Sequence, residues 1–428
     1  MPRQRLDAEK HRRTTAKAVV VEGFFNKLGF GIVTFAIPLY ALSLGLNVAE
    51  IGILVAAKAA IQPLVKPLMG IAIDRFGARR GYLTAVSLRF VSTAVLLVAD
   101  TLAGLLAVRF IQGAASAAQE PASITVLAKT QRDRLGRAFS AVLAARDVAK
   151  VSAGAAAGLL LAATGSFTLL WIVVSVIALI PVLVVVAFVR DVAAHGEELP
   201  DAEPAPVPDE VARVLRSPTL RLIAGLGLMA GMTAHMTHAM FQVYATEVAG
   251  LGPGEIGVIY SLSVASLLAV GPPAGWVADR YGNGLLASSR AVANAVSSIA
   301  YLIFPSFAGL LGGRLVDDAG KAAFRPTWAS LLGTASRRAG TRGGRVVANL
   351  DAVMSIGEAL GPVVAGLIWN WAGAAAFLIT RAVLGIATEA IFGRRLRAAL
   401  AGEAPNRRAD RAAGEAELTL RDEALPNT

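Results

Sequence analysis

A short motif that occurs twice constrains the fold of this chain more than any other feature of its sequence. Residues 70–77 read Gly-Ile-Ala-Ile-Asp-Arg-Phe-Gly, and residues 275–282 read Gly-Trp-Val-Ala-Asp-Arg-Tyr-Gly. The same spacing relates Arg109 to Arg314. Each copy ends a long apolar segment, so the sequence predicts two related halves of about 200 residues, each built from hydrophobic helices.

The composition places these helices in a membrane. Hydrophobic residues make up 55% of the chain and charged residues 17%, a balance far too apolar for a soluble domain of this length. The sequence has no cysteine, which excludes disulfides and thiolate metal sites. The net charge of +11 lies mostly in short loops and tails beside apolar segments. We therefore interpret it as a topology signal and expect no nucleic-acid partner.

Twelve segments are long and apolar enough to cross a bilayer as helices, which takes roughly 20 residues. They are 18–43, 48–72, 82–100, 102–128, 138–163, 167–190, 219–247, 254–278, 284–304, 306–332, 346–371 and 375–393. A linker rich in Pro and Glu separates the six-helix bundles, so the predicted parts are 1–17, 18–190, 191–218, 219–393 and 394–428. We predict an all-α membrane protein with twelve transmembrane helices in two pseudo-symmetric six-helix bundles.

The loop charges predict the orientation of these helices. The connections on one side contain no Lys or Arg; they are 44–47, 100–101, 164–166, 248–253, Pro305 and 372–374. The opposite connections carry the arginines of both motif copies. Because Lys and Arg remain in cytoplasmic loops, both termini and both motifs are predicted to face the cytoplasm. The expected location is the inner (plasma) membrane, and the polar start predicts no removable signal peptide.

Residues 15–398 resemble the major facilitator superfamily. The signature that this family carries between its second and third helices is similar to Gly70, Asp74, Arg75, Gly77, Arg79 and Arg80. The second copy keeps Gly275, Asp279, Arg280 and Gly282 but has Asn283-Gly284 in place of the basic pair. The glycines allow a tight turn. The Asp and Arg can form an ion-pair latch with neighbouring helix ends when the cytoplasmic side closes.

Two further similarities bear on coupling. The run from Leu105 through Arg109, Gln112 and Gly113 is similar to the intramembrane arginine motif of the family, which is often linked to proton coupling. The antiporter pattern of the fifth helix is only partly present, because Gly154 and Gly158 lack the proline of the family. Small residues also occur wherever membrane helices approach closely. These glycines thus indicate antiport and close packing equally.

Ionisable residues inside the predicted spans are candidates for function, because each costs at least about 2.5 kcal/mol at the bilayer centre. The residues predicted for proton coupling or a central cavity are Glu22, Lys27, Arg109, Gln112, Glu120, Asp147, Lys150, Arg314, Asp317, Asp318, Lys321 and Arg325. The first half carries seven positive and three negative intramembrane charges, a net of +4. That excess favours an anionic or zwitterionic substrate group.

Some of these charges have a structural alternative. Glu22, Arg89, Arg290 and Glu389 lie near predicted helix ends, from which long side chains can extend to the membrane interface. Asp147 and Lys150 are one turn apart and can neutralise each other locally.

Spacing also predicts a gate between the halves. Lys58 and Lys66 share one stripe of the second helix, and Asp351 and Glu358 share a face of the eleventh. In the fold that the resemblance implies, these two helices face each other. We hypothesise that Lys58 pairs with Glu358, and Lys66 with Asp351, when the cytoplasmic side closes.

The segment 219–247 has a distinctive composition. It holds Met232, His235, Met236, His238 and Met240 at helical spacing. Thioether and imidazole groups suit soft ions such as Cu(I), so metal binding by Met232, Met236 and His235 is one alternative. Met stripes more often form adaptable packing or a permissive substrate wall, and we favour that role.

Taken together, these features predict a transporter and not an enzyme, with no cofactor and no resident metal. The expected mechanism is alternating access, with a midplane site between the halves and coupling to protons. The expected partners are a small-molecule substrate, protons and the lipid bilayer, and a monomer is sufficient. Efflux of a small organic molecule with a polar or anionic portion is preferred. The alternatives are proton-coupled uptake of an organic anion and transport of a soft metal.

Overall fold

A computed structural model describes residues 2–130, 135–189, 217–281, 288–339 and 343–396. The helices of the first half are α1 (Pro2–Ser43), α2 (Val48–Phe76), α3 (Ala78–Val95), α4 (Leu102–Thr130), α5 (Leu135–Thr164) and α6 (Phe167–Phe188). Those of the second half are α8 (Pro218–Glu247), α9 (Pro253–Tyr281), α11 (Ser289–Ile303), α12 (Phe307–Ala339) and α13 (Gly343–Thr388), which continues into a short π-helix, η3 (Glu389–Gly393). The linker predicted at 191–218 and the predicted tail lie almost entirely outside the described residues.

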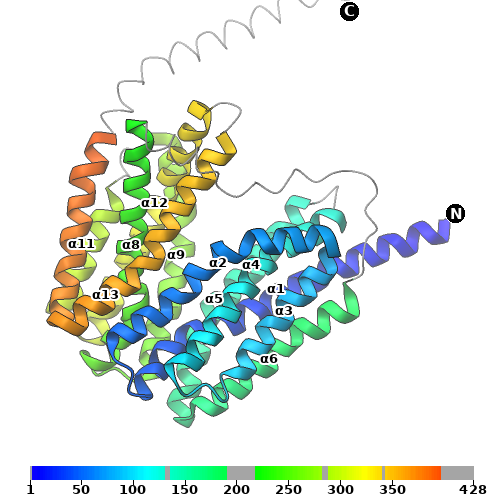
Figure 1. Cartoon of the computed structure of the whole chain (residues 1–428), viewed down its shortest axis with the longest axis horizontal. Helices are drawn as coiled ribbons and strands as arrows, with labels where there is room; N and C mark the ends of the chain where they lie inside the picture. The colour runs from blue at the N-terminus through cyan, green and yellow to red at the C-terminus, as the bar shows by residue number, and fades with distance from the viewer. Residues whose placement is uncertain (1, 131–134, 190–216, 282–287, 340–342, 397–428) are drawn as a thin grey trace, which may run out of the picture.

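The helix α13 accounts for the twelfth span. It contains a non-helical residue, Gly373, with φ of 88°, which is a backbone conformation that glycine adopts at low cost. The label α13 therefore covers two helices, which correspond to the predicted spans 346–371 and 375–393 and meet at the predicted loop 372–374. The predicted fold of twelve helices in two six-helix bundles is confirmed, and Figure 1 shows the two bundles side by side.

Six of the described helices are individually long and apolar enough to cross a membrane. They lie in α1, α2, α5, α6, α9 and α13. By contrast, α12 carries Arg314, Asp317, Asp318 and Lys321 within two turns, which lowers its mean hydropathy. Such a helix is stable in a bilayer only when its charges face protein partners.

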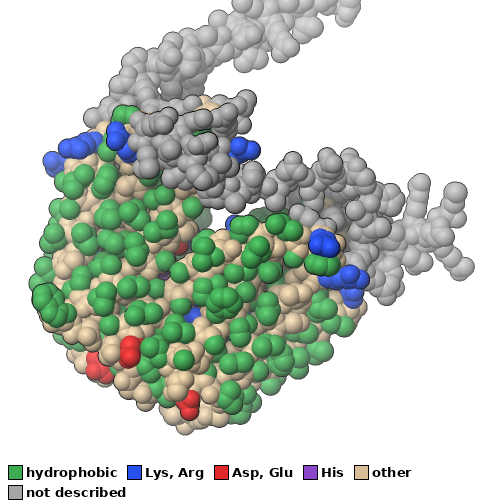
Figure 2. Space-filling view, in the orientation of Figure 1, with side chains coloured by type: hydrophobic (Ala, Val, Ile, Leu, Met, Phe, Trp, Pro, Cys, Tyr) green, Lys and Arg blue, Asp and Glu red, His purple; other side chains and the backbone are tan. Residues whose placement is uncertain are grey.

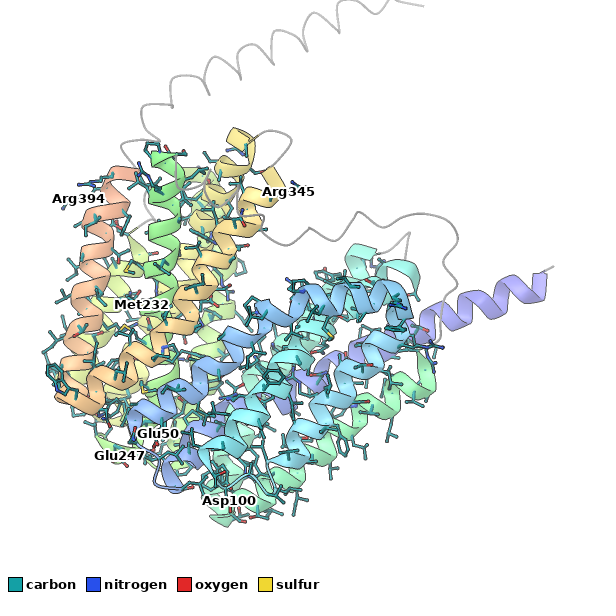
Figure 3. The ribbon with its side chains drawn as sticks, viewed as in Figure 1. Glu50, Asp100, Met232, Glu247, Arg345 and Arg394 are labelled. Carbon is teal, nitrogen blue, oxygen red and sulfur yellow. The ribbon has the colours of Figure 1, made fainter. Side chains whose placement is uncertain are left out.

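The two ends of the molecule differ in charge. Glu50, Asp100 and Glu247 lie at one end, and Arg345 and Arg394 lie at the other (Figure 3). Figure 2 shows the same separation of acidic and basic side chains on one face of the surface. We call these the acidic end and the basic end. The bundles meet at the acidic end and diverge toward the basic end (Figure 1).

Glycine contacts close the acidic end, with α2 packing against α13 and α5 against α9. A Cβ atom added to Gly158 would lie 2.4 Å from the carbonyl oxygen of Pro253 and 2.9 Å from Cα of Gly257. On the other side, a Cβ on Gly52 would lie 3.3 Å from Cα of Gly366. The backbones of the two halves therefore touch, an approach that only small residues allow. We call these four glycines the acidic-end seal.

One hydrogen bond and one ring contact support the seal. The amide of Ala155 donates to the hydroxyl of Ser261 across the halves, at 2.8 Å. The rings of Phe35 and Tyr260 pack edge to face with centroids 5.7 Å apart. The largest hydrophobic core of the molecule runs through both halves here, so the acidic end is where the bundles are joined.

Leucine at the seal is expected to open the acidic end. Overpacking costs about 1–3 kcal/mol, so Gly158→Leu should shift the equilibrium away from this conformation at least about fivefold. The chain has no cysteine, so spin labels can be attached at Arg137→Cys and Arg221→Cys, two exposed positions near the basic end. Opening of the acidic end should bring these two labels closer together. Gly312→Leu is the matched control, because open space surrounds that position. An unchanged distance distribution in Gly158→Leu would contradict the assignment.

Candidate functional site: a charged cavity and a buried ion-pair network

The first motif copy forms a turn that ties α3 to the end of α6. Gly77, between α2 and α3, has φ of 91°, which explains the glycine. The Nε atom of Arg79 donates to the carbonyl of Val189 at 2.5 Å, and its Nη2 atom donates to that of Val186 at 3.4 Å. A cation at the carbonyl end of a helix is electrostatically favourable. Arg79 therefore joins the start of α3 to the end of α6 within the first half.

The other motif residues are placed less completely. Arg75, Arg80 and Arg280 are exposed. The backbones of Gly70 and Gly275 have open space where a side chain would be. The side chains of Asp74 and Asp279, and all of Gly282, lie outside the described residues. The ion-pair latch therefore stays a prediction.

A polar cavity of about 190 Å³ lies inside the first half. Its charged lining residues are Lys27, Lys58, Arg89, Arg146 and Glu120. Three of these cations surround one ring: the charged groups of Lys27, Lys58 and Arg89 lie 4.9, 3.8 and 4.8 Å from the centroid of Phe30. The electron-rich face of an aromatic ring attracts cations, so Phe30 holds three like charges close together.

Arg89 is the most enclosed of these cations. It is 5% exposed, and its Nη2 atom donates to the hydroxyl of Ser116 at 2.9 Å. Its Nε and Nη1 atoms have no hydrogen-bond partner in the protein. A buried donor without an acceptor costs about 1–3 kcal/mol, and both atoms are closed off from the cavity in this conformation.

Glu22 lies behind the cavity wall and is fully buried. Its carboxylate accepts hydrogen bonds from Asn26 at 2.7 Å, from Gln119 at 2.9 Å and from the hydroxyl of Tyr82. The interfacial alternative is wrong for Glu22, and equally for Arg89 and Arg290, because each is at most 5% exposed. Their charges are held by protein partners inside the bundles.

Three of the residues predicted for coupling or a cavity, Arg109, Gln112 and Glu120, lie on α4. Arg109 is 2% exposed and donates to Gln112 at 3.1 Å, and the hydroxyl of Ser116 donates to the Gln112 carbonyl at 2.8 Å. Glu120, further along, is exposed toward the cavity. These residues therefore lead from Arg109 to the cavity wall.

Asp147 and Lys150 form the local pair that their spacing predicts. Their charged atoms are 2.8 Å apart, and the side chains are 32% and 41% exposed. Neither is among the residues that line the cavity. An exposed pair of this kind contributes little to stability.

The second half contains a buried network centred on Asp317, a fully buried residue of α12. Its carboxylate lies 2.6 Å from Arg381, 3.0 Å from Arg290, 3.2 Å from Lys321 and 4.0 Å from Arg314. These cations come from α11, α12 and α13. One carboxylate thus joins three helices by charge.

Arg381 is the most completely bonded residue of this network and is fully buried. It donates to the carbonyl of Thr233 at 3.0 Å, to the side-chain oxygen of Asn294 at 2.9 Å and to the hydroxyls of Ser297 and Ser298. Its guanidinium therefore also links α8 to α11 and α13.

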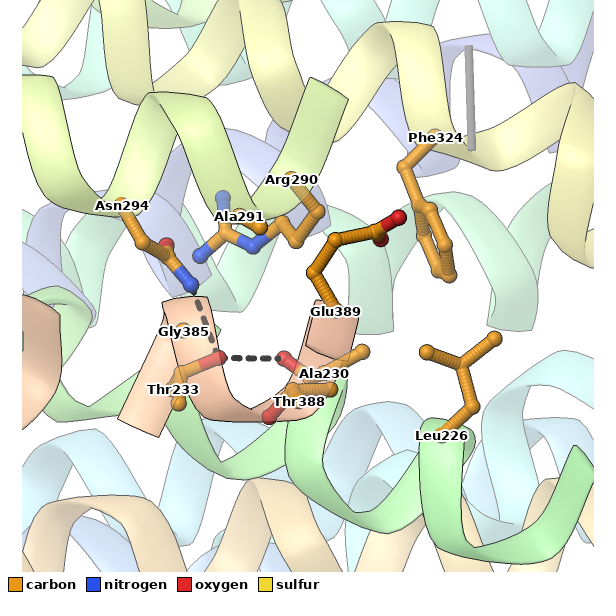
Figure 4. Close-up of a pocket in the computed structure, with 10 residues that line it drawn as sticks. All are labelled: Leu226, Ala230, Thr233, Arg290, Ala291, Asn294, Phe324, Gly385, Thr388 and Glu389. Carbon is orange, nitrogen blue, oxygen red and sulfur yellow. Dashed lines mark hydrogen bonds between the residues drawn. The ribbon is translucent and has the colours of Figure 1, made fainter. Parts of the chain in front are cut away.

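Asp318 forms the second centre of the network. It lies 2.8 Å from Lys321 and 3.4 Å from Arg314, and it accepts a hydrogen bond from Ser263 of α9. Four predicted residues, Arg314, Asp317, Asp318 and Lys321, thus come together, whereas Arg325 is exposed. Figure 4 shows a neighbouring pocket beside Arg290 and Glu389 of about 10 Å³, which is close to the space that one water needs.

The four residues of the predicted gate lie apart in this conformation. Lys58 faces Phe30 in the first half, and Lys66 is exposed. Asp351 accepts a hydrogen bond from Trp328 at 3.1 Å, and Glu358 packs beside Gly231. Because the halves diverge at the basic end, this conformation does not test pairing in a closed one, and the gate stays a prediction.

The Met and His residues of α8 lie between the hydrophobic core and the network. Met236 and Met240 are fully buried in the core that runs through both halves, and Met232 is 8% exposed. The rings of His235 and His238 are 5.6 Å apart, and His238 lies 3.5 Å from Arg314. Among the described residues no cluster of three His, Asp or Glu could hold a metal ion. Metal transport stays an untested hypothesis.

Sequence reasoning gave no role to Arg381, Asn294, Thr233 and Phe30, which the structure places at the centre of these two clusters. Arg381 had a signal, since it is an arginine within a predicted span. Phe30 had none beyond its position one turn after Lys27. Its role depends on α2 and α3 being adjacent to α1, which no local pattern encodes.

Two related six-helix bundles around a charged interior define a secondary transporter. The chain belongs to the Major Facilitator Superfamily, whose sequence model matches residues 21–283 and 223–423. It is a membrane transporter of that family and not an enzyme.

The relatives and structural neighbours include several kinds of transporter. The probable vesicular acetylcholine transporter-B of Danio rerio is 26% identical over 385 residues, which is 85% of this chain and 75% of that protein. The human vesicular acetylcholine transporter is matched over 60% of its length. A multidrug resistance protein B homolog of Mycobacterium tuberculosis is 29% identical over 157 residues, 35% of this chain and 28% of that protein. The nucleoside transporter NupG shares the fold, with a TM-score of 0.73, 14% identity and coverage of 88% and 99% of the two chains.

Removing the central carboxylate of the network is expected to destabilise the second half. Asp317→Asn leaves Arg381 and Arg290 buried without their counter-charge, which should lower the free energy of unfolding by about 3–5 kcal/mol. Asp147→Asn breaks an exposed pair and should cost at most about 1 kcal/mol. Unfolding in mixed micelles measures both. Equal costs for the two variants would show that the network does not hold these helices together.

Proposed function

We propose that this protein moves a small organic molecule with a polar or anionic portion across the membrane by alternating access, coupled to protons. The observation that carries the proposal is the closure at one end only. The acidic-end seal joins the halves, and the bundles diverge toward the basic end around charged interiors. Rocking the two halves against each other around this interior would close the basic end and open the acidic end, which is the second conformation that alternating access requires.

The basic end is proposed to be cytoplasmic. Arg79, Arg80, Arg221, Arg345 and Arg394 lie there, near the ends of α2, α6, α8, α12 and η3, and positive loop charge remains on the cytoplasmic side. This conformation would then be open to the cytoplasm. A monomer in the inner (plasma) membrane with both termini inside is the matching arrangement.

The cavity of the first half supports an anionic group on the substrate. Four cations and one carboxylate line it. Acetylcholine, which the vesicular relatives carry in their name, is a cation. It would meet Lys27, Lys58 and Arg89 without a matching excess of carboxylates, so its transport is not part of this proposal.

Direction distinguishes two candidate functions. Efflux by exchange for protons is supported by the partial antiporter glycines and by the similarity to a multidrug resistance homolog over part of the chain. Proton-coupled uptake of an organic anion is supported by the cations around Phe30. The cavity observation comes from this chain itself and favours the second.

Reconstitution tests the proposal directly. Proteoliposomes with a luminal pH dye and an inward proton gradient should take up at least one of radiolabelled benzoate, succinate or sulfate, and no choline, at a rate that falls when the gradient is removed. Luminal acidification beyond that of protein-free liposomes would indicate movement of protons with the anion, and alkalinisation would indicate exchange. Transport of choline alone, or transport indifferent to the gradient, would contradict the proposal.

The gate between the halves is part of the proposal and has its own test. Lys66→Asp or Asp351→Lys should keep the basic end open at least about tenfold more often, because like charges would meet on closure. The double variant should restore closure, read from the same spin-label pair at positions 137 and 221. The corresponding variants of Lys58 and Glu358 test the deeper pair by this readout, since Lys58 also lines the cavity. Doubles that behave like the sum of their singles would rule out the pairing.

A further inference from the structure

Two charge environments adjoin each other in the first half. On one side, the cations of Lys27, Lys58 and Arg89 surround Phe30 at the cavity. On the other, the Glu22 carboxylate is buried one hydrogen bond behind the cavity wall, because both Asn26 and Gln119 line the cavity and donate to it. The wall between the two is therefore made of side-chain amides.

The cationic side carries an excess of positive charge. Lys27, Lys58, Arg89 and Arg146 line a cavity of about 190 Å³, and Glu120 is the one carboxylate among its lining residues. A carboxylate, sulfonate or sulfate group forms charge-assisted hydrogen bonds with such cations. The cavity is large enough for a small organic anion, and its excess of positive charge favours such a ligand.

Glu22 differs from the carboxylates of the second half. Its hydrogen bonds come from neutral donors, and among the described residues no lysine or arginine nitrogen lies within ion-pair distance of it. Asp317, by contrast, has four cationic partners. Glu22 is thus a buried carboxyl that can accept a proton without losing an ion pair.

The charged groups around Glu22 determine whether its protonation strengthens or weakens anion binding. Tyr82 of α3 donates to its carboxylate. Across the amide wall, the cavity carries Arg89 from α3, Glu120 from α4, Arg146 from α5, Lys27 from α1 and Lys58 from α2. The helix α6 carries no charged residue. Four cations and two carboxylates leave an excess of two positive charges when Glu22 is ionised and of three when it is protonated. A proton on Glu22 therefore strengthens the attraction of the cavity for an anion.

We propose that an anionic substrate group binds at Arg89, Lys27 and Lys58 while a proton binds Glu22, and that the two cross the membrane together. This inference rests on the proposed function and adds the sign of its coupling, which is symport. By reciprocity, whatever factor the proton adds to anion affinity, the anion adds to proton affinity. In proton exchange, the proton would have to leave before the anion bound, and this would weaken the attraction of the cavity for the anion.

Calorimetry of the purified full-length protein tests the coupling. Benzoate and sulfate are the probes, because both stay ionised between about pH 6 and about pH 8, and choline is the cationic comparison. At least one anion should bind about tenfold more tightly at the lower pH, within the usual coupling range of about 5- to 150-fold. Titration in two buffers of different ionisation enthalpy should show proton uptake on binding. Benzoate binding alone would indicate a carboxylate substrate, and sulfate binding alone a tetrahedral oxyanion.

Variants assign the proton and the anion. Glu22→Gln should remove both the proton uptake and the pH dependence while anion binding persists. Tyr82→Phe keeps the carboxyl and should keep the uptake, which covers the case in which Glu22→Gln does not fold. Arg89→Gln should weaken anion binding at least about tenfold, since it removes a buried charge-assisted contact. Asp100→Asn, an exposed loop carboxylate at the acidic end, is the control and should change nothing.

Each contrary result has a distinct meaning. Proton release on anion binding would overturn the symport sign, and unchanged uptake in Glu22→Gln would overturn the assignment of the proton. Failure of both anions to bind would overturn the anion site. Proton-driven flux that persists in Glu22→Gln would overturn this inference and leave the proposed function intact. Absence of proton-driven flux in the protein without substitutions would contradict the proposed function itself.

Discussion

The structure depends on how charged side chains are stabilised inside a low-dielectric interior. A lone charge at the bilayer centre is costly, and this chain places many charges there. In the second half the solution is internal, because Asp317 and Asp318 are shared among Arg290, Arg314, Lys321 and Arg381. In the first half it is incomplete, since three cations share one ring and only one carboxylate lines the cavity beside them. The halves have the same architecture but different electrostatic tasks.

This division suits a protein whose halves rock as rigid bodies. The Asp317 network binds α8, α11, α12 and α13 to one another, and Arg79 binds α3 to the end of α6 within the first half. Between the halves, by contrast, contact at the acidic end depends on glycines and on apolar packing. The ion pairs described above lie inside each body. The acidic-end interface, including its hydrogen bond from Ala155 to Ser261, can separate without leaving a charge unpaired.

Much of the fold was readable because bilayer thickness imposes a length on every span. The apolar segments, the turn at Gly77 and the break at Gly373 all follow from local composition, and the structure has them at the predicted places. The α12 charges were recognisable as candidates because a charge inside a span is costly. The sequence did not show which of these charges pair with one another. Glu22, Arg89 and Arg290 could equally have reached the interface, and only the neighbouring helices show that they are buried.

The sequence by itself determined a membrane protein of two related six-helix halves, because apolar length, loop charge and an internal repeat are local properties of the chain. Only the tertiary structure decided which charges meet. Phe30, Lys58 and Arg89 come from three helices, and Arg381 reaches Asp317 across 64 residues. Electrostatic energy depends on distance in space, and that distance is defined only once the helices are packed.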